Sequence, residues 1–188
     1  MKILVLDNYD SFTYNLVYIV RELGYGKHMD IYRNDKIRLE DVAGYDKILL
    51  SPGPGVPEDA GIMPALLKQY GSEKDILGVC LGHQAIGEAY GSGLINLTEV
   101  VHGVASKIKV KEDLLFKGLP ESFTVGRYHS WVIDESTLPS ELEVIAKTPD
   151  GQIMAVRHVA HRVRGVQFHP ESILTEHGVA MMQNWLGS

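Results

Sequence analysis

The sequence predicts an α/β fold of three layers, in which helices flank a mostly parallel central sheet and the second half is rich in hairpins. Two observations lead to this prediction. In the first half, short apolar runs alternate with apolar residues repeated at helical spacing, an order typical of parallel sheets covered by helices. In the second half, strand-like runs follow one another across turn sequences with little helix between them.

The chain opens with a strand and a helix. Residues 3–6 form a continuous apolar run, which is typical of a strand buried on both faces. Apolar side chains then recur at helical spacing from Phe12 to Leu23. Asp10 or Ser11 is the expected N-cap of this helix, and Gly24 follows its end.

The same alternation continues along the chain. The first half is expected to add strands at 29–33, 47–50 and 76–79, a helix at 63–70, and a helix after Cys80. The second half is expected to hold strands at 106–110, 143–147, 152–158 and 164–168, with a turn at 149–151. A closing helix is predicted over 175–186, with Thr175 as its N-cap.

Composition indicates one domain and argues against nucleic acid and membranes as partners. The 188 residues are 45% apolar and 22% charged, enough for one well-buried core, so residues 1–188 are predicted to form a single domain. The net charge of −6 is not gathered into a basic stripe, so neither nucleic acid nor a membrane surface is an expected partner. A single cysteine and the lack of any long apolar run predict a cytoplasmic protein.

Cys80 lies between Gly78 and Gly82, after an apolar run and before a helical one. This is the spacing of the Gly-x-Ser-x-Gly nucleophile elbow, with sulfur in place of oxygen. Glycines let strand and helix approach closely, and a helix N-terminus favours thiolate over thiol, with the Leu81 N–H as an oxyanion donor. A lone cysteine is more often a small buried apolar residue, but the two glycines at this turn favour a nucleophile.

His169 and Glu171 are the candidates for a base and its orienting group. His169 follows the strand-like run 165–168, and Glu171 is two residues further on, so both side chains are expected on one side of an extended segment held by Pro170. Alone, these residues could be an ordinary polar strand end. The other histidines have weaker claims, and no spacing of ligands suggests a metal site.

The strand at 47–50 is followed by the loop Ser51-Pro52-Gly53-Pro54-Gly55-Val56-Pro57. Its prolines restrict the backbone and its glycines expose N–H groups, which suits recognition of an oxyanion or a carboxamide. The loop lacks the Lys-Ser/Thr ending of a phosphate-binding loop, so nucleotide binding is not indicated. The alternative interpretation is that these prolines and glycines form an ordinary turn after the strand.

Five ordered motifs resemble those of the class I (triad) glutamine amidotransferases, and within them the branch that serves anthranilate synthase and aminodeoxychorismate synthase. They are Asp7-Asn-Tyr-Asp-Ser-Phe-Thr-Tyr-Asn15, Ser51-Pro-Gly-Pro-Gly55, Gly78-Val-Cys-Leu-Gly-His-Gln84, Arg127-Tyr-His-Ser130 and Gly165-Val-Gln-Phe-His-Pro-Glu-Ser172. The resemblance covers essentially the whole chain and implies the flavodoxin-like fold of this family.

The resemblance also implies roles for individual residues. Cys80, His169 and Glu171 are the expected triad. Gly53, Pro54, Gly55 and Leu81 are expected to contact the oxyanion and the glutamine backbone, and Gln84, Ser130 and Trp131 to hold L-glutamine. The chain is expected to need no cofactor. Its partner is expected to be a chorismate-binding synthase subunit, which carries the Mg²⁺. This is component I of anthranilate synthase or, as the alternative, that of aminodeoxychorismate synthase or both.

Two departures from the family pattern stand out. Trp131 replaces a usual leucine, and Val104-Ala105 replace a usual Lys-Thr pair. Tryptophan is tolerable if residue 131 contacts the ligand through its main chain, whereas the changes at 104–105 are expected to alter the partner surface.

Two other functions remain open from the residues. A free-standing cysteine hydrolase of γ-glutamyl peptides would use the same triad without a partner. A non-catalytic flavodoxin-like module would leave Cys80 inert.

Overall fold

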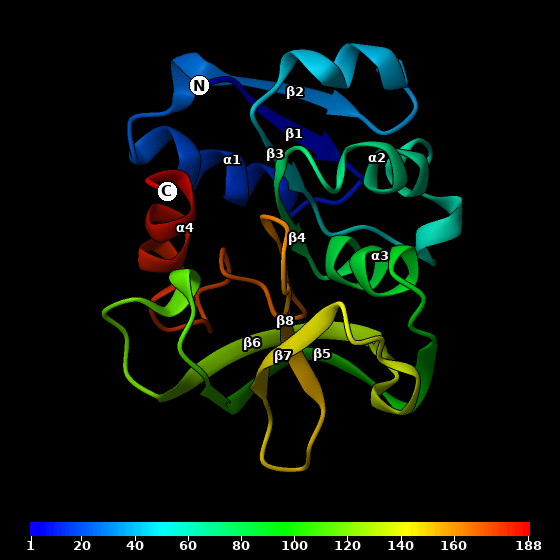
Figure 1. Ribbon diagram of the computed structural model, residues 1–188. Helices are drawn as coiled ribbons and strands as arrows, with labels where there is room; N and C mark the ends of the chain where they lie inside the picture. The colour runs from blue at the N-terminus through cyan, green and yellow to red at the C-terminus, as the bar shows by residue number, and fades with distance from the viewer.

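The computed structural model describes residues 1–188, and one nine-stranded sheet runs through it in the order β2-β1-β3-β4-β9-β8-β7-β5-β6 (Figure 1). The strands are β1 (Ile3–Asp7), β2 (Met29–Arg33), β3 (Lys47–Leu50), β4 (Asp75–Val79), β5 (Leu94–Val110), β6 (Ser122–Ile133), β7 (Leu142–Lys147), β8 (Ile153–His158) and β9 (Val163–Val166). The helices are α1 (Thr13–Glu22), α2 (Met63–Tyr70), α3 (Leu81–Ala89) and α4 (Gly178–Leu186). Short 3₁₀ turns lie at Gly26–His28, Leu39–Gly44, Pro57–Asp59, Leu114–Phe116 and Glu135–Thr137.

The parallel half of the sheet comprises β2, β1, β3, β4 and β9. Every residue of β1, β3 and β4 is buried, because helices cover both faces. Val5 and Leu49 pack with α1 and α4 on one face, and Leu6 and Leu50 pack with α2 and α3 on the other. Figure 1 shows these two helix pairs on opposite sides of the strands. The predicted three-layer α/β fold is confirmed.

The second half is antiparallel, as predicted. β9, β8, β7, β5 and β6 pair in succession, and β7 turns into β8 through a loop in which Gly151 has a φ of 89°. In Figure 1 the long strands β5 and β6 lie below the parallel half. The sequence indicated only the last five residues of β5 and none of β6. Residues 94–105 are mostly exposed and so lack a clean alternation, and β6 carries polar residues that belong to the site described below.

Both predicted helix N-caps are wrong. Phe12 holds the N-cap position of α1, and Asp10 instead accepts a hydrogen bond from the Phe12 N–H at 2.8 Å. His177 holds that position before α4, with a φ of 61°. Thr175 lies before the helix because its hydroxyl donates to the His169 carbonyl at 2.6 Å and accepts from the Gly126 N–H at 2.9 Å. The predicted last strand also ends earlier, at Val166.

A buried ion pair ties the end of α4 to the sheet. Lys47 Nζ lies 2.7 Å from Asp75 Oδ2 and donates to the Trp185 carbonyl at 2.8 Å. The Trp185 indole N–H donates to Asp75 Oδ1 at 2.8 Å. Both charged side chains are nearly inaccessible to solvent. Asp75 therefore satisfies two buried donors at once.

Asp75→Ala is expected to lower the free energy of unfolding by about 3–5 kcal/mol, because it leaves the Lys47 ammonium buried without a counter-charge. Urea denaturation measures this change. Asp41→Ala is the matched control, since it breaks the exposed pair with Arg38 and is expected to cost less than about 1 kcal/mol. Equal losses for the two variants would contradict the stabilising role of the buried Lys47–Asp75 pair.

None of the helices combines the length and apolar character needed to cross a bilayer.

Candidate active site

The site lies at the edge of the sheet where the parallel strands end. Because β1, β3, β4 and β9 run in the same direction, the segments that follow them emerge side by side. These segments begin at Asn8, Ser51, Cys80 and Gln167. Four of the five sequence motifs, which are far apart along the chain, are thereby brought to one edge of the sheet.

Cys80 occupies the predicted tight turn between β4 and α3. Its φ of 52° and ψ of −98° are a strained combination for a residue with a side chain. A Cβ on Gly78 would come within 2.5 Å of the Gly82 main chain, and one on Gly82 would come within 2.6 Å of the Leu50 carbonyl oxygen. Both glycines are therefore sterically required, and the predicted tight turn at Cys80 is confirmed.

The Cys80 sulfur is held at the N-terminus of α3 and is largely buried. The side-chain amide of Gln167 lies 3.7 Å from Sγ, and the Tyr128 carbonyl oxygen lies 3.6 Å from it. The free N–H groups of the first helical turn and the positive end of the helix dipole stabilise negative charge there. The arrangement can therefore support a thiolate.

His169 and Glu171 form a buried pair, with Nδ1 and Oε1 2.6 Å apart. Burial opposes the charged imidazolium, but the interactions with Cys80 and Glu171 outweigh it and raise the pKa of His169 to about 10. The other nitrogen, Nε2, is buried and makes no direct hydrogen bond, so it is free to interact with the neighbouring Cys80. Such contacts often tighten only when substrate binds.

Neighbouring residues fix the His169 ring and backbone. The rings of Phe12 and Tyr128 lie against the imidazole, with centroid distances of 5.0 and 4.9 Å. The His169 N–H donates to the Gly126 carbonyl at 3.0 Å, and Thr175 holds the His169 carbonyl as described above. β6 and the N-cap of α1 therefore contribute to the orientation of the imidazole.

A cavity of about 260 Å³ opens beside Cys80, a volume suited to an amino acid. It is lined by Gly53, Pro54, Gly55, Cys80, Gln84, Tyr128, His129, Ser130 and Trp131. The structure thus gathers seven of the ten predicted site residues around one cavity. His169 and Glu171 are buried beside Cys80. Leu81 is the first residue of α3, so its N–H has no acceptor within the helix.

The cavity wall at Trp131 is held by hydrogen bonds to the main-chain carbonyl of that residue. The Trp131 carbonyl accepts hydrogen bonds from Gln84 Nε2 at 3.0 Å and from His129 Nδ1 at 3.0 Å. His129 must carry its proton on Nδ1, because Nε2 accepts from Arg127 Nε. Burial and the Arg127 charge lower the pKa of His129 to about 3. This neutral histidine, with both nitrogens engaged, does not compete with His169 as a base.

Several residues of the site were not predicted from the sequence. Tyr128 and His129 line the cavity, and Gln167 and Phe12 contact Cys80 or His169. Tyr128 and His129 belong to the sequence motif at 127–130. Because β6 was not predicted, this motif could not be placed opposite Cys80. His83 is fully buried against Gly165, and burial lowers its pKa to about 3.

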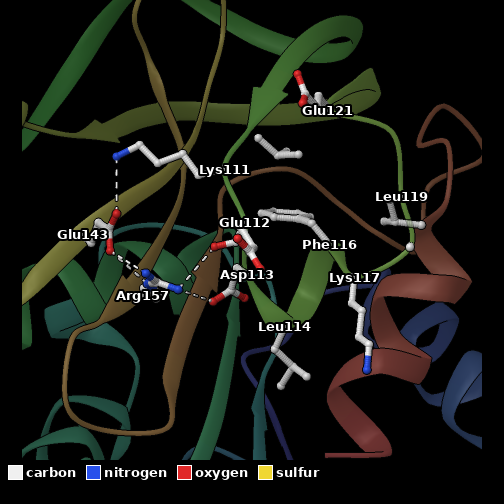
Figure 2. A pocket seen from close by; sticks show the side chains of 12 residues that line it. Lys111, Glu112, Asp113, Leu114, Phe116, Lys117, Leu119, Glu121, Glu143 and Arg157 are labelled. Carbon is white, nitrogen blue, oxygen red and sulfur yellow. Dashed lines mark hydrogen bonds and ion pairs between the residues drawn. The ribbon is translucent and has the colours of Figure 1, made fainter.

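A larger cavity lies elsewhere, with a volume of about 1000 Å³. Figure 2 shows that the charged side chains of Lys111, Glu143, Arg157 and Asp113 lie close together, whereas those of Lys117 and Glu121 point away from this group. Arg157 pairs with Glu143 at 2.7 Å and with Asp113 at 3.3 Å, and Lys111 lies 3.4 Å from Glu143. These groups form ion pairs with one another, and no cysteine, serine, threonine or histidine lines the cavity. No cluster of three or more His, Cys, Asp or Glu side chains is placed to hold a metal ion.

Comparison with known proteins gives consistent matches. Residues 4–187 match the family described as class-I glutamine amidotransferase. The chain is 48% identical to anthranilate synthase component 2 of Mycobacterium tuberculosis, over 99% of this chain and 82% of the relative. It is 44% identical to aminodeoxychorismate synthase component 2 of Klebsiella aerogenes, over 98% of each.

Two further matches concern chain length and fold. The chain is 42% identical to the bifunctional protein TrpGD of Thermotoga maritima, where 98% of this chain spans only 32% of the relative. The crystal structure of a Thermoplasma acidophilum protein, described as one of the subunits of GMP synthase, superposes with a TM-score of 0.87 and 28% identity. That superposition covers all of this chain and 92% of the other.

Proposed function

Because this chain belongs to the class-I glutamine amidotransferase family, we propose that it is the glutaminase subunit of an anthranilate synthase. It hydrolyses L-glutamine and delivers the ammonia to a chorismate-binding synthase subunit. The observation that carries the proposal is the Cys80–His169–Glu171 group beside a cavity of amino-acid size. Relatives at 42–48% identity that include anthranilate synthase subunits support the choice of pathway.

The first step forms a covalent glutamyl enzyme. The Cys80 thiolate attacks the side-chain amide carbon of glutamine, and the Leu81 N–H with the loop 53–55 stabilises the developing oxyanion. The imidazolium of His169 gives its proton to the nitrogen as the C–N bond breaks. Ammonia leaves, and a γ-glutamyl thioester remains on the sulfur.

The second step restores the enzyme. Neutral His169 takes a proton from water, and the resulting hydroxide attacks the thioester carbon. The C–S bond breaks, glutamate leaves, and thiolate and imidazolium are re-formed. Glu171 holds the imidazole in the orientation that serves both steps, and Gln84, Ser130 and Trp131 hold the glutamine against Cys80.

Ammonia is a nucleophile only while it is unprotonated, so the synthase subunit must be docked when it is released. The proposed partner is component I of anthranilate synthase, which would carry any Mg²⁺ that the second reaction needs. This chain itself would use no cofactor and would act in the cytoplasm. Neither nucleic acid nor a membrane takes part in the proposed reaction.

A second candidate partner is component I of aminodeoxychorismate synthase, because a component 2 of that enzyme is 44% identical over nearly the whole chain. Reconstitution with each synthase subunit, glutamine and chorismate separates the two. Anthranilate formation with the first partner only is the expected result. Aminodeoxychorismate formation alone would overturn the choice of pathway. Fast hydrolysis of γ-glutamyl peptides without any partner would favour a free-standing hydrolase instead.

Glu171→Gln is expected to move the alkaline limb of the kcat profile for glutamate release to lower pH. The carboxylate is one of the groups that raise the pKa of His169, so its loss lets the imidazolium release its proton at lower pH. Glu176→Gln, on the same segment but bonded to the Thr124 N–H, should leave the limb in place. An unchanged limb in Glu171→Gln would show that another group titrates.

A further inference from the structure

The segment after β1 is locked to the loop that lines the cavity at 53–55. Asn8 is buried, and its main-chain N–H donates to the Ser51 hydroxyl oxygen at 2.8 Å. Its side-chain Nδ2 donates to the Ser51 carbonyl at the same distance. The Ser51 hydroxyl in turn donates to the Pro52 carbonyl at 2.7 Å. Asn8 thus holds the start of the loop through two direct bonds.

The Asn8 side chain cannot turn away from these bonds. Its Oδ1 accepts from Asn34 Nδ2 at 3.0 Å, and its Nδ2 also lies 3.4 Å from the Met63 sulfur. Asn34 in turn accepts the Ile62 N–H at its main-chain carbonyl. The amide of Asn8 is therefore fixed at both ends by residues on three separate segments.

Gly53 rests directly on Asn8. A Cβ at residue 53 would lie 2.6 Å from Asn8 Cβ, 2.7 Å from the Asn8 carbonyl oxygen and 2.7 Å from Leu81 Cδ2. No space separates the two loops. Any displacement of Asn8 must therefore be passed to Gly53, and from there to the cavity beside Cys80.

The backbone around Asn8 is held in a costly conformation. Tyr9, the next residue, has a φ of 63°, which an aromatic residue rarely adopts. Asp7 Oδ1 stabilises this turn by accepting from the Tyr9 N–H and the Thr13 hydroxyl, each at 3.0 Å. Strain of this kind persists where the surroundings impose it, and it is concentrated at functional sites.

We propose that Asn8 is a positioning residue, which fixes the loop 51–55 so that its N–H groups meet the oxyanion of the glutamine reaction. Asn8 does not line the cavity and acts only through Ser51 and Gly53. The inference rests on the proposed glutaminase function. It also gives the opening motif at 7–15 a physical role, because Asp7 and Tyr9 shape the turn that presents Asn8.

The test compares two reactions of Cys80 in the complex with the synthase subunit. Asn8→Ala is expected to lower kcat for glutamate release by about 10- to 100-fold, less than the roughly 10²- to 10³-fold that complete removal of an oxyanion donor costs. Alkylation of Cys80 by iodoacetamide should stay within about 2-fold, because displacement of iodide by the thiolate develops no oxyanion. An unchanged kcat would overturn the inference, and so would a parallel loss of both rates.

Two further variants make the test decisive. Asn184→Ala also removes two hydrogen bonds of an asparagine Nδ2, those to the Leu115 and Lys117 carbonyls at 3.0 Å, but on α4. It should keep the parent kcat. Ser51→Ala, a milder change if Asn8→Ala does not fold, should lower kcat several-fold with alkylation retained. If the parent complex releases no glutamate from glutamine, the proposed function fails. If the parent complex releases glutamate but the Asn8 and Ser51 variants keep its kcat, the positioning role alone fails.

Discussion

Cys80→Ser is expected to lower glutamine-dependent product formation by roughly 10⁴-fold or more, because a serine hydroxyl at this position is neither ionised nor a strong enough nucleophile. Product formation from added ammonia should be unchanged, since that reaction takes place on the synthase subunit. Both rates are measured in the reconstituted complex with chorismate. The serine variant keeps the size of the side chain at the strained turn, so the fold should be retained.

Loss of both rates in Cys80→Ser would contradict this division of labour, because it would show that the residue also supports the synthase reaction or the assembly of the complex. A second check uses a diazo-ketone analogue of glutamine. This electrophile should label the parent chain at Cys80 and leave the serine variant unlabelled. Absence of labelling in the parent would favour the non-catalytic alternative.

His169→Asn is the second large effect, with an expected loss of about 10³-fold or more in kcat for glutamate release. The substitution removes both the acid that protonates the departing amide nitrogen and the positive charge that pairs with the thiolate. Iodoacetamide alkylation of Cys80 should therefore slow as well, unlike in Asn8→Ala. His28→Asn, at an exposed histidine in the turn before β2, is the matched control and should change neither rate.

The double variant Cys80→Ser with His169→Asn extends this prediction. Residues that act as one unit are not additive, so the double variant should be no less active than the worse single variant. A multiplicative loss would show that His169 acts independently of Cys80 and would contradict the mechanism.

Much of the first half of the fold could be predicted from the sequence because its strands are buried on both faces. Runs such as 3–6 and 48–50 contain only apolar residues, so no polar side chain blurs the pattern. The turn at Cys80 was predictable for a different reason, since only glycine fits beside it at 78 and 82. A steric requirement between residues close together in the chain can therefore be recognised from a single sequence.

The site opposite Cys80 was less visible, because it depends on contacts between distant segments. β6 was missed since Arg127 and His129 interrupt its apolar alternation in order to support the Trp131 carbonyl. Thr175 resembles a helix cap but is engaged by His169 and Gly126. The contact of Asn8 with Ser51 spans 43 residues, and no local periodicity reports it.

The central claim is that glutamine passes through a thioester on Cys80, and acid quenching during turnover tests it most directly. Intact-mass analysis and peptide mapping of the quenched complex should show one added glutamyl group on the peptide that contains Cys80. The adduct should be absent without glutamine and in Cys80→Ser. Steady glutamate release with Cys80 unmodified at every quench time, or with the glutamyl group on another residue, would contradict the account.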